Sequence, residues 1–245
     1  MTQTFCIIIV EWIFIFNSED KTLIEVRNLT VETGEKTVLR NISFKWKNGQ
    51  RYGIYGTHGA GKTELLDRLA GACHCESGTV LINGFDMQRE PIKAREFIGY
   101  LPQKNVLYEQ MTPVEYLMYI ADVKGMGYEK AIHTISGLLD VTAVAPRRDC
   151  LIANLSSFEK KCIGVAQTAL GKSDILVLDD PWSGLSSYEI QKMNALLKFL
   201  SEKATLIVSC CKKEMLCDLC DFVFLLHDGV LTEDEIKQTE TEEKI

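Results

Sequence analysis

One stretch of eight residues decides how this chain folds: Gly56-Thr57-His58-Gly59-Ala60-Gly61-Lys62-Thr63. It matches the pattern G-x-x-x-x-G-K-[ST] at every fixed position. The glycines let the backbone bend so that successive N–H groups point inward at phosphate oxygens. Lys62 brings a positive charge to the outer phosphates, and Thr63 offers a hydroxyl to Mg²⁺. The sequence therefore predicts a nucleotide-binding loop to which all eight residues belong.

The flanks of this loop support the same interpretation. Residues 50–55 read as a strand entering the loop, and residues 63–70 have the spacing of a helix leaving it. A helix N-terminus under the phosphates favours a bound anion. The alternative is a chance glycine-rich turn, which would require neither a strand before it nor a helix after it.

Two carboxylates end an apolar run further along the chain. Residues 175–178 are Ile, Leu, Val and Leu, and Asp179-Asp180-Pro181 follows. Such a run is typical of a central parallel strand that is covered on both faces, and ligands bind at the carboxyl ends of such strands. Asp179 is predicted to hold Mg²⁺ through water, and Asp180 to polarise an attacking water. The alternative role for Asp179 is a helix cap.

The composition is that of an ordinary globular protein. The chain has 245 residues, of which 46% are hydrophobic and 25% charged, enough for one large α/β domain. Its net charge is −7, and residues 232–245, with six acidic and two basic side chains, carry −4 of it. The weakly acidic body argues against a nucleic-acid partner, which usually needs a basic face.

The first residues form an unusual apolar segment. Residues 5–16 are apolar apart from Glu11, but a membrane span needs about 20 such residues, and no basic region of an export signal precedes them. An added edge strand, a membrane-surface contact and a translated upstream stretch without a native role remain as interpretations. We favour the last two.

Nine cysteines without an export signal indicate a reducing compartment. Cys73-His74-Cys75 and a second group at positions 210, 211, 217 and 220 could hold zinc or form a redox pair. No second ligand pair stands at zinc-finger spacing, so we favour scattered core thiols.

Helical spacing interrupts the alternation of strands and helices between Thr112 and Leu139, with Gly125 and Gly127 dividing that region into two helices. Strands are expected at 23–26, 38–44, 79–82 and 98–101 before it, and at 175–179, 205–209 and 222–226 after it. Strands that alternate with helices imply a parallel sheet.

Over Thr22–Thr232 the chain resembles the ATP-binding domain of ABC transporters, and from Gly99 to Gly125 it looks most like export-type members. Gln103 resembles that family's glutamine loop, and residues 155–161 occupy the place of its LSGGQ signature. The resemblance implies an α/β P-loop NTPase fold with a mixed, mainly parallel central sheet, an antiparallel β subdomain and an inserted α-helical subdomain at about 104–170. Residues 1–21 are then an apolar extension, and 233–245 an acidic tail.

The resemblance also implies a function and partners. It implies an ATPase that uses ATP and Mg²⁺, with Gln103 contacting the metal and acting in catalysis beside Asp180, and with Ser156 touching the nucleotide of a second ATP-binding subunit. That subunit makes a homodimer or heterodimer. The pair would act on a separate membrane permease, and would lie at the cytoplasmic face of the membrane as a peripheral protein.

Five positions depart from the family's pattern. Two stand in the signature, where Ser157 and Phe158 replace glycines and the Phe158 ring is expected where backbone should approach. Asp180 replaces the catalytic glutamate, and a misplacement near 1 Å can cost about 10²-fold in rate. Cys211 replaces the switch histidine, a donor whose loss costs on the order of 10²–10³ in rate. Ser186 replaces an aspartate.

In addition, residues 30–36 contain no aromatic side chain to stack on adenine. These departures affect residues that the resemblance assigns to ATP hydrolysis, whereas the residues that it assigns to Mg-ATP binding match the pattern. Two hypotheses follow: an ATPase subunit of an exporter, or a degenerate partner that holds Mg-ATP and hydrolyses it slowly in an asymmetric pair. A non-transport ATPase of the same superfamily is the third, and the acidic body disfavours it.

Overall fold

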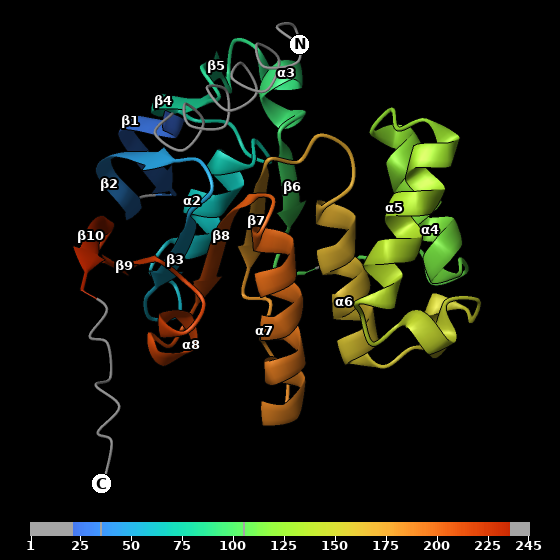
Figure 1. The fold of residues 1–245 in the computed structure, drawn as a ribbon. Helices are drawn as coiled ribbons and strands as arrows, with labels where there is room; N and C mark the ends of the chain where they lie inside the picture. The colour runs from blue at the N-terminus through green and yellow to red at the C-terminus, as the bar shows by residue number, and fades with distance from the viewer. Residues whose placement is uncertain (1–21, 35, 105, 236–245) are drawn as a thin grey trace, which may run out of the picture.

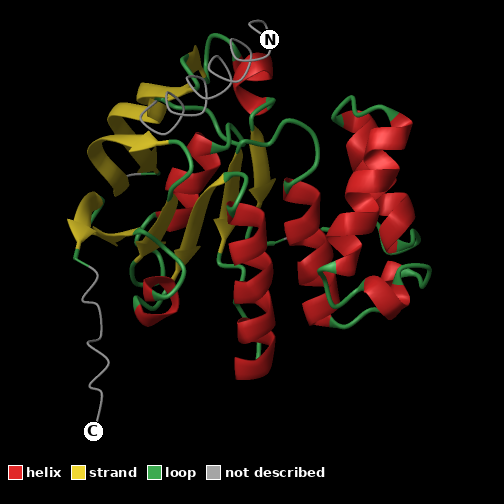
Figure 2. Cartoon of the chain, viewed as in Figure 1, coloured by secondary structure: helices red, strands yellow, loops and turns green. Residues whose placement is uncertain are grey.

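The structure is a computed structural model that describes residues 22–34, 36–104 and 106–235. It contains an antiparallel sheet, a central sheet and a group of helices at one side (Figures 1 and 2). The predicted extension at 1–21 and residues 236–245 of the predicted tail lie outside the described residues. Among the described residues, no helix combines the length and apolar character needed to cross a membrane.

The antiparallel sheet has the strand order β2-β1-β4-β5. Its strands are β1 (Thr22–Thr33), β2 (Lys36–Lys47), β4 (Ser77–Ile82) and β5 (Phe85–Asp86). β1 and β2 form a long hairpin, within which the sequence predicted only the parts at 23–26 and 38–44. The remaining residues of both strands are mostly polar and exposed, apart from the buried Leu29, Val31 and Trp46, so only a short apolar alternation marks them in the sequence.

The central sheet has the strand order β10-β9-β3-β8-β7-β6. All neighbouring strands are parallel except β9 and β10, so the sheet is mixed and mainly parallel, as predicted. Its strands are β3 (Arg51–Tyr55), β6 (Ile98–Leu101), β7 (Ile175–Asp179), β8 (Thr205–Cys210), β9 (Phe222–His227) and β10 (Val230–Asp234). β10 includes Glu233 and Asp234, so the sheet extends two residues into the predicted tail.

Helices cover the central sheet and extend beyond its β6 edge. They are α2 (Lys62–Leu69), α3 (Pro91–Arg95), α4 (Pro113–Val123), α5 (Tyr128–Asp140), α6 (Ser157–Thr168), α7 (Ser187–Ser201) and α8 (Glu214–Cys217), with short 3₁₀ turns η1 (Ala145–Arg147) and η2 (Ile152–Asn154). α4 and α5 lie at the side of the molecule away from the antiparallel sheet, with α6 between them and the central sheet (Figure 1). α4 and α5 are the two helices predicted between 112 and 139.

Strand β7 separates two hydrophobic cores. Every residue of β7 is buried. Ile175 and Val177 point into the core shared with α2 and the antiparallel sheet, whereas Leu176 and Leu178 point into the core shared with α6 and α7. The alternation follows from the period of two in a strand, and burial on both faces explains why the run is continuously apolar. The α/β fold class predicted from the sequence is confirmed.

Candidate functional site

The loop at residues 56–63, which the sequence predicts to bind a nucleotide, joins β3 to α2 at the carboxyl edge of the central sheet. A Cβ on Gly56 would lie 2.4 Å from the carbonyl oxygen of Leu226, so no other residue fits without moving β9. Gly61 has a φ of 102° and packs against the side chain of Leu39, which fixes the turn into the helix. The backbone of the loop therefore requires glycine at both positions.

Lys62 is buried and folds back over this loop. Its Nζ donates to the carbonyl oxygens of Gly56, at 2.8 Å, and Thr57, at 3.0 Å. These contacts hold the ammonium group over the loop. His58, in the same loop, is exposed.

A chain of hydrogen bonds joins the loop to the end of β7. Thr63 Oγ1 donates to Asp179 Oδ2 at 2.6 Å, and Ser209 Oγ donates to Asp179 Oδ1 at 2.5 Å. The backbone N–H of Asp180 donates to Ser209 Oγ at 3.1 Å. Asp179 is 2% exposed, so both carboxylate oxygens are held in fixed directions away from bulk water. The structure thus brings together two of the three residues that were assigned to magnesium, Thr63 and Asp179.

Asp180 has the backbone conformation of a turn directly after the strand. Its φ is +50°, in the left-handed region that asparagine and aspartate tolerate better than most other side chains. Burial raises the pKa of its carboxyl group, and the positive charge of Lys161 partly opposes that rise. A carboxylate with a raised pKa at the edge of a nucleotide site is suited to accept a proton.

Cys211 follows β8 and lies beside the loop. Its Sγ is 3.9 Å from Nζ of Lys62, and its side chain is exposed. Cys211, which the sequence comparison aligns with the switch histidine, therefore lies next to the lysine of the loop. None of the described histidines takes its place: His58 lies within the loop, and His227 ends β9.

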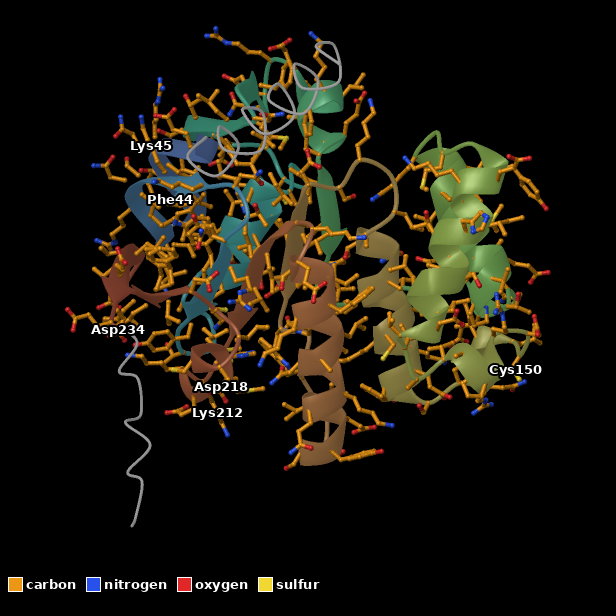
Figure 3. All side chains as sticks on the ribbon, viewed as in Figure 1. Phe44, Lys45, Cys150, Lys212, Asp218 and Asp234 are labelled. Atoms are coloured by element: carbon orange, nitrogen blue, oxygen red, sulfur yellow. The ribbon has the colours of Figure 1, made fainter. Side chains whose placement is uncertain are left out.

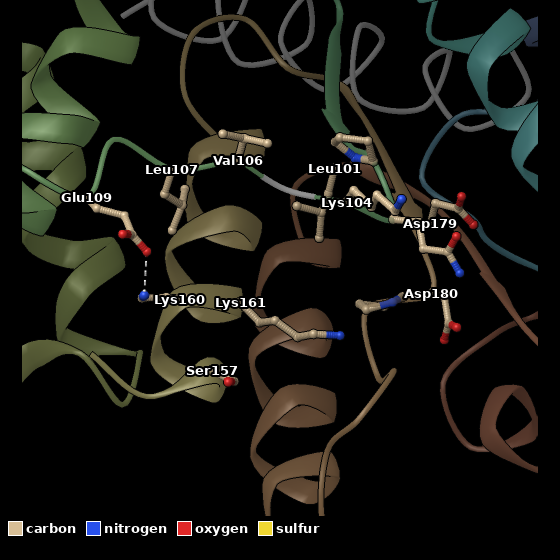
Figure 4. Close-up of a pocket in the computed structure, with 13 residues that line it drawn as sticks. Leu101, Lys104, Val106, Leu107, Glu109, Ser157, Lys160, Lys161, Asp179 and Asp180 are labelled. Carbon is tan, nitrogen blue, oxygen red and sulfur yellow. Dashed lines mark hydrogen bonds and ion pairs between the residues drawn. The ribbon is translucent and has the colours of Figure 1, made fainter. Parts of the chain in front are cut away.

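A pocket of about 580 Å³ opens beside the two carboxylates (Figure 4). The residues that line it include Leu101, Gln103, Lys161, Asp179, Asp180 and Pro181. Gln103 is exposed in the segment after β6, and so lies at the same pocket as the carboxylates. Its neighbours Val106 and Leu107 continue the lining toward α6, which makes that side of the pocket apolar.

The signature segment begins α6. Ser156 caps this helix: its side chain accepts a hydrogen bond from the N–H of Glu159 at 3.2 Å, while Glu159 Oε2 accepts from the N–H of Ser156 at 2.7 Å. Ser156 and Ser157 are exposed. Ser157 lines the pocket, whereas Ser156 is not among its lining residues.

The expectation for Phe158 is wrong. Its side chain is 7% exposed and lies in the core formed with α6 and α7, so it turns away from the exposed helix start. Phe158, Cys162 and Val165 are all buried at a spacing of four and then three residues, which is the spacing of one helix face. The Phe158 ring therefore belongs to the core, and only Ser156 and Ser157 are exposed at the start of the signature segment.

Two residues of the site were not found from the sequence. Ser209 lies inside β8 and binds Asp179 and Asp180, although the sequence shows only an apolar run there. Lys161 lies on α6 and donates from Nζ to the carbonyl oxygen of Ser183 at 2.5 Å. Both act across the fold, so no local motif points to them.

The described cysteines lie in several separate parts of the fold. Cys150 lies among the helices on one side of the molecule, far from Lys212 and Asp218 near α8 on the other (Figure 3). Within residues 22–34, 36–104 and 106–235, no group of three or more His, Cys, Asp or Glu residues could hold a metal ion. Burial raises the pKa of Cys162 and Cys210 to about 12, as expected for core thiols.

Comparisons with known proteins agree with this geometry. A family model described as ABC transporter matches residues 39–183. Nod factor export ATP-binding protein I of Burkholderia orbicola is 30% identical over 207 residues, which cover 84% of this chain and 68% of that protein. An uncharacterized ABC transporter ATP-binding protein of Methanocaldococcus jannaschii is 31% identical over 210 residues, which cover 85% of this chain and 76% of that protein.

A solved structure shows the same fold. It is the dimer of an ATP-binding cassette in a post-hydrolysis state with ADP and phosphate, at a TM-score of 0.78, and the match covers 88% of this chain and 100% of that one at 22% identity. The family model covers more than half of the sequence. This chain is therefore an ATP-binding domain of the ABC transporter family.

Proposed function

We propose that this chain binds Mg-ATP at residues 56–63 and, as one of two ATP-binding subunits, drives transport by a separate membrane permease. The observation that carries the proposal is the 2.6 Å hydrogen bond between Thr63 and Asp179, which joins the loop to the carboxyl end of β7. Ligands of parallel α/β sheets bind at this edge. The loop, the ammonium of Lys62 and the buried Asp179 carboxylate lie together at this edge. We expect the loop and Lys62 to bind the phosphates of ATP, and Asp179 to bind the metal.

The residues present fit a magnesium ion. Mg²⁺ prefers oxygen ligands and keeps several waters, so one hydroxyl and one carboxylate suffice on the protein side. Thr63 and Asp179 would hold it, and Gln103, which lines the same pocket, would supply an amide oxygen. The metal supplies charge neutralisation on the phosphates when bound. Ser209 fixes the direction of Asp179 and so acts on the metal through it.

Hydrolysis would be carried by Asp180 and assisted by Gln103. A water attacks the terminal phosphorus while the bond from that phosphorus to the bridging oxygen of ADP breaks, and the water proton passes to the Asp180 carboxylate. Burial raises the pKa of that carboxyl group, which strengthens it as a base. Lys62 would leave the carbonyl oxygens of Gly56 and Thr57 for the phosphates, a move that its flexible stem allows.

We further propose that turnover is weakened. The Asp180 carboxylate is one methylene shorter than the glutamate it replaces, and Cys211 offers a neutral thiol beside Lys62 where a stronger donor would stabilise the transition state. The second candidate function is therefore a subunit that holds Mg-ATP in an asymmetric pair. The 3.9 Å contact between Cys211 and Lys62 favours it, because a neutral thiol then lies beside the ammonium group of the loop.

The partners follow from the exposed surfaces. Ser156 and Ser157 begin α6 with free access to solvent, so a second subunit could present its nucleotide to this helix start. The helical subdomain exposes large apolar side chains that a membrane permease could cover: Tyr108, Tyr119, Val123, Tyr128 and Ile132. Such docking would place the chain at the cytoplasmic face of the membrane as a peripheral subunit. The likeness to the Nod factor export protein supports export as the direction.

A direct titration tests the proposal. The full chain should bind Mg-ATP, and Lys62→Ala should weaken binding by about 100-fold or more, because two charge-assisted hydrogen bonds to phosphate are lost. Lys198→Ala, an exposed lysine on α7, is the matched control and should leave the affinity unchanged. Thermal denaturation of each variant separates loss of binding from loss of folding. Unchanged retention of Mg-ATP by a folded Lys62→Ala variant would overturn the proposal.

A further inference from the structure

We propose that the cavity between α5, the loop that follows α6 and the end of α7 binds a small organic anion with an apolar body, such as a medium-chain monocarboxylate. The cavity has a volume of about 330 Å³. Ser173 and Leu176 in its wall lie just before β7 and at the start of that strand, whereas Asp179 ends the strand at the edge proposed to bind the nucleotide. The inference therefore goes beyond the proposed function and does not depend on it.

The floor of the cavity is apolar and belongs to the core shared with α6 and α7. Leu138, Leu176 and Leu200 line it, and all three are at most 6% exposed. Phe199 lines the same cavity but is 43% exposed, so part of its ring faces solvent. A hydrocarbon body in the cavity would cover apolar surface that water now contacts.

Gly137 marks open space in the wall that α5 provides. It lies inside the helix and lines the cavity, yet a Cβ built on it would meet no neighbouring atom within 4 Å. Glycine destabilises the interior of a helix relative to alanine, and neither a positive φ nor a close neighbour requires glycine at this position. The space beside Gly137 is therefore room that the fold itself does not fill.

Two basic side chains without a partner line the same cavity. His133 on α5 and Lys203 after α7 make no side-chain hydrogen bond or ion pair within the part of the chain that the structure describes. Of the described residues that line the cavity, none is Asp or Glu. Lys172, in contrast, lies 3.5 Å from Glu96 in an ion pair. The ammonium group of Lys203 is thus available to an anion.

A second ammonium group lies behind the wall of the cavity. Ser173 Oγ accepts a hydrogen bond from Lys124 Nζ at 3.1 Å, and both groups donate to the carbonyl oxygen of Leu170 at 2.8 Å. These partners are neutral, and desolvation lowers the pKa of Lys124 to about 8, with no carboxylate among the described residues to oppose it. Lys124 and Lys203 therefore give the cavity a positive potential that a bound anion would neutralise.

The apolar floor and the unpaired charges together define the ligand. An inorganic anion would leave the floor uncovered, and a neutral hydrocarbon would leave Lys203 without a partner. A monocarboxylate with a short hydrocarbon chain satisfies both, with its carboxylate at Lys203 and His133 and its chain against the leucines.

Calorimetric titration of the full, nucleotide-free chain with octanoate tests the proposal. We expect one saturable site. Octan-1-ol keeps the chain without the charge and acetate keeps the charge without the chain, so each should bind at least about 10-fold more weakly. An excess of Mg-ATP should leave the affinity for octanoate unchanged, because the cavity and the proposed nucleotide site lie at opposite ends of β7.

Variants locate the binding site. Lys203→Met should weaken octanoate binding about 10-fold, whereas Lys198→Met, at an exposed lysine of α7 that does not line the cavity, should leave it unchanged. Gly137→Leu should abolish binding because the new side chain fills the open space. Its Tm should be no lower than that of the wild type, since leucine favours a helix more than glycine does.

Three results would overturn the proposal: no saturable binding by the folded wild type, equal affinity for octanoate and octan-1-ol, or unchanged binding by Gly137→Leu. Competition by Mg-ATP would place octanoate in the nucleotide pocket and would overturn it as well. If the chain binds octanoate as expected but does not bind Mg-ATP, the inference stands and the proposed function fails.

Discussion

The residues proposed to bind the nucleotide, here called the gripping region, and those proposed to hydrolyse it, the turnover region, lie at the same edge of the central sheet but are built differently. The gripping region is buried and bonded to itself: Thr63 and Ser209 both donate to Asp179, and Lys62 folds over its own loop. The turnover region is more open, with an exposed thiol at Cys211 and a partly buried carboxylate at Asp180. Buried groups bonded to one another tolerate little change, whereas an open position accepts a different side chain without disturbing the fold.

The comparison predicts that damage to the gripping region is severe. Asp179→Asn replaces one of two acceptor oxygens by an NH₂ group, which then faces a hydroxyl donor, so we expect the magnesium dependence of ATP binding to be lost and hydrolysis to fall about 100-fold. Titration with and without Mg²⁺ measures this. Asp174→Asn, an exposed position just before the opposite end of β7, is the control. Equal effects of both changes would show that the strand, and not the metal site, is damaged.

The signature segment offers a test of stability. Phe158 is 7% exposed in the core, so Phe158→Ala should lower the free energy of unfolding by about 3 kcal/mol. Ser157→Gly, at the neighbouring exposed position, should cost about 1 kcal/mol or less. Denaturant unfolding measures both. If Phe158→Ala were instead neutral for stability and improved nucleotide-dependent dimerisation, the ring would face the partner as the sequence suggested.

This error about Phe158 shows where sequence reasoning succeeds and fails here. The loop, β7 and its carboxylates could be predicted because each depends on residues adjacent in sequence and on a general property of parallel sheets. The orientation of Phe158 depends on which side of α6 packs. Its spacing to Cys162 and Val165 is that of one buried helix face, whereas its position within the signature motif does not indicate which way the ring points.

Other parts of the site depend on tertiary placement. Ser209 is separated from Asp179 by 30 residues, and nothing in its own segment distinguishes it from a strand residue. Lys161 reaches Ser183 from another layer of the fold. The short elements β5 and α8 have too few residues for a periodic pattern, so the sequence did not predict them.

Two substitutions in the turnover region should raise the rate of ATP hydrolysis. Asp180→Glu combined with Cys211→His restores the longer carboxylate and a stronger donor beside Lys62, so we expect the hydrolysis rate to rise about 10-fold. The glutamate must adopt a φ of +50°, which costs roughly 1 kcal/mol, so unfolding should be measured with the rate. Asp180→Asn with Cys211→His is the control and should show no gain. An unchanged rate in a folded double variant would place the limiting defect at Ser157 or Ser186.

The smallest expected effect is on the stability of the fold, which the buried Asp180 carboxylate lowers when it is ionised. Burial raises its pKa, so the folded state binds more protons than the unfolded state between the unfolded pKa and the raised one. Stability therefore falls as pH rises through that window, and the whole destabilisation is present at neutral pH. Asp180→Asn tolerates the same left-handed φ without a charge, so its Tm should exceed that of the wild type at pH 7.

The difference in Tm should disappear on acidification below about pH 4, because the wild-type carboxyl group is then protonated in both states. Asp149→Asn, at an exposed turn position, controls for the removal of a charge from the surface. Wild-type and Asp180→Asn curves of Tm against pH that run parallel from pH 7 to pH 3.5 would mean that the fold does not penalise this charge. Asp180 would then be an ordinary surface carboxylate, and the contrast between a rigid grip and a strained, adjustable turnover group would not hold.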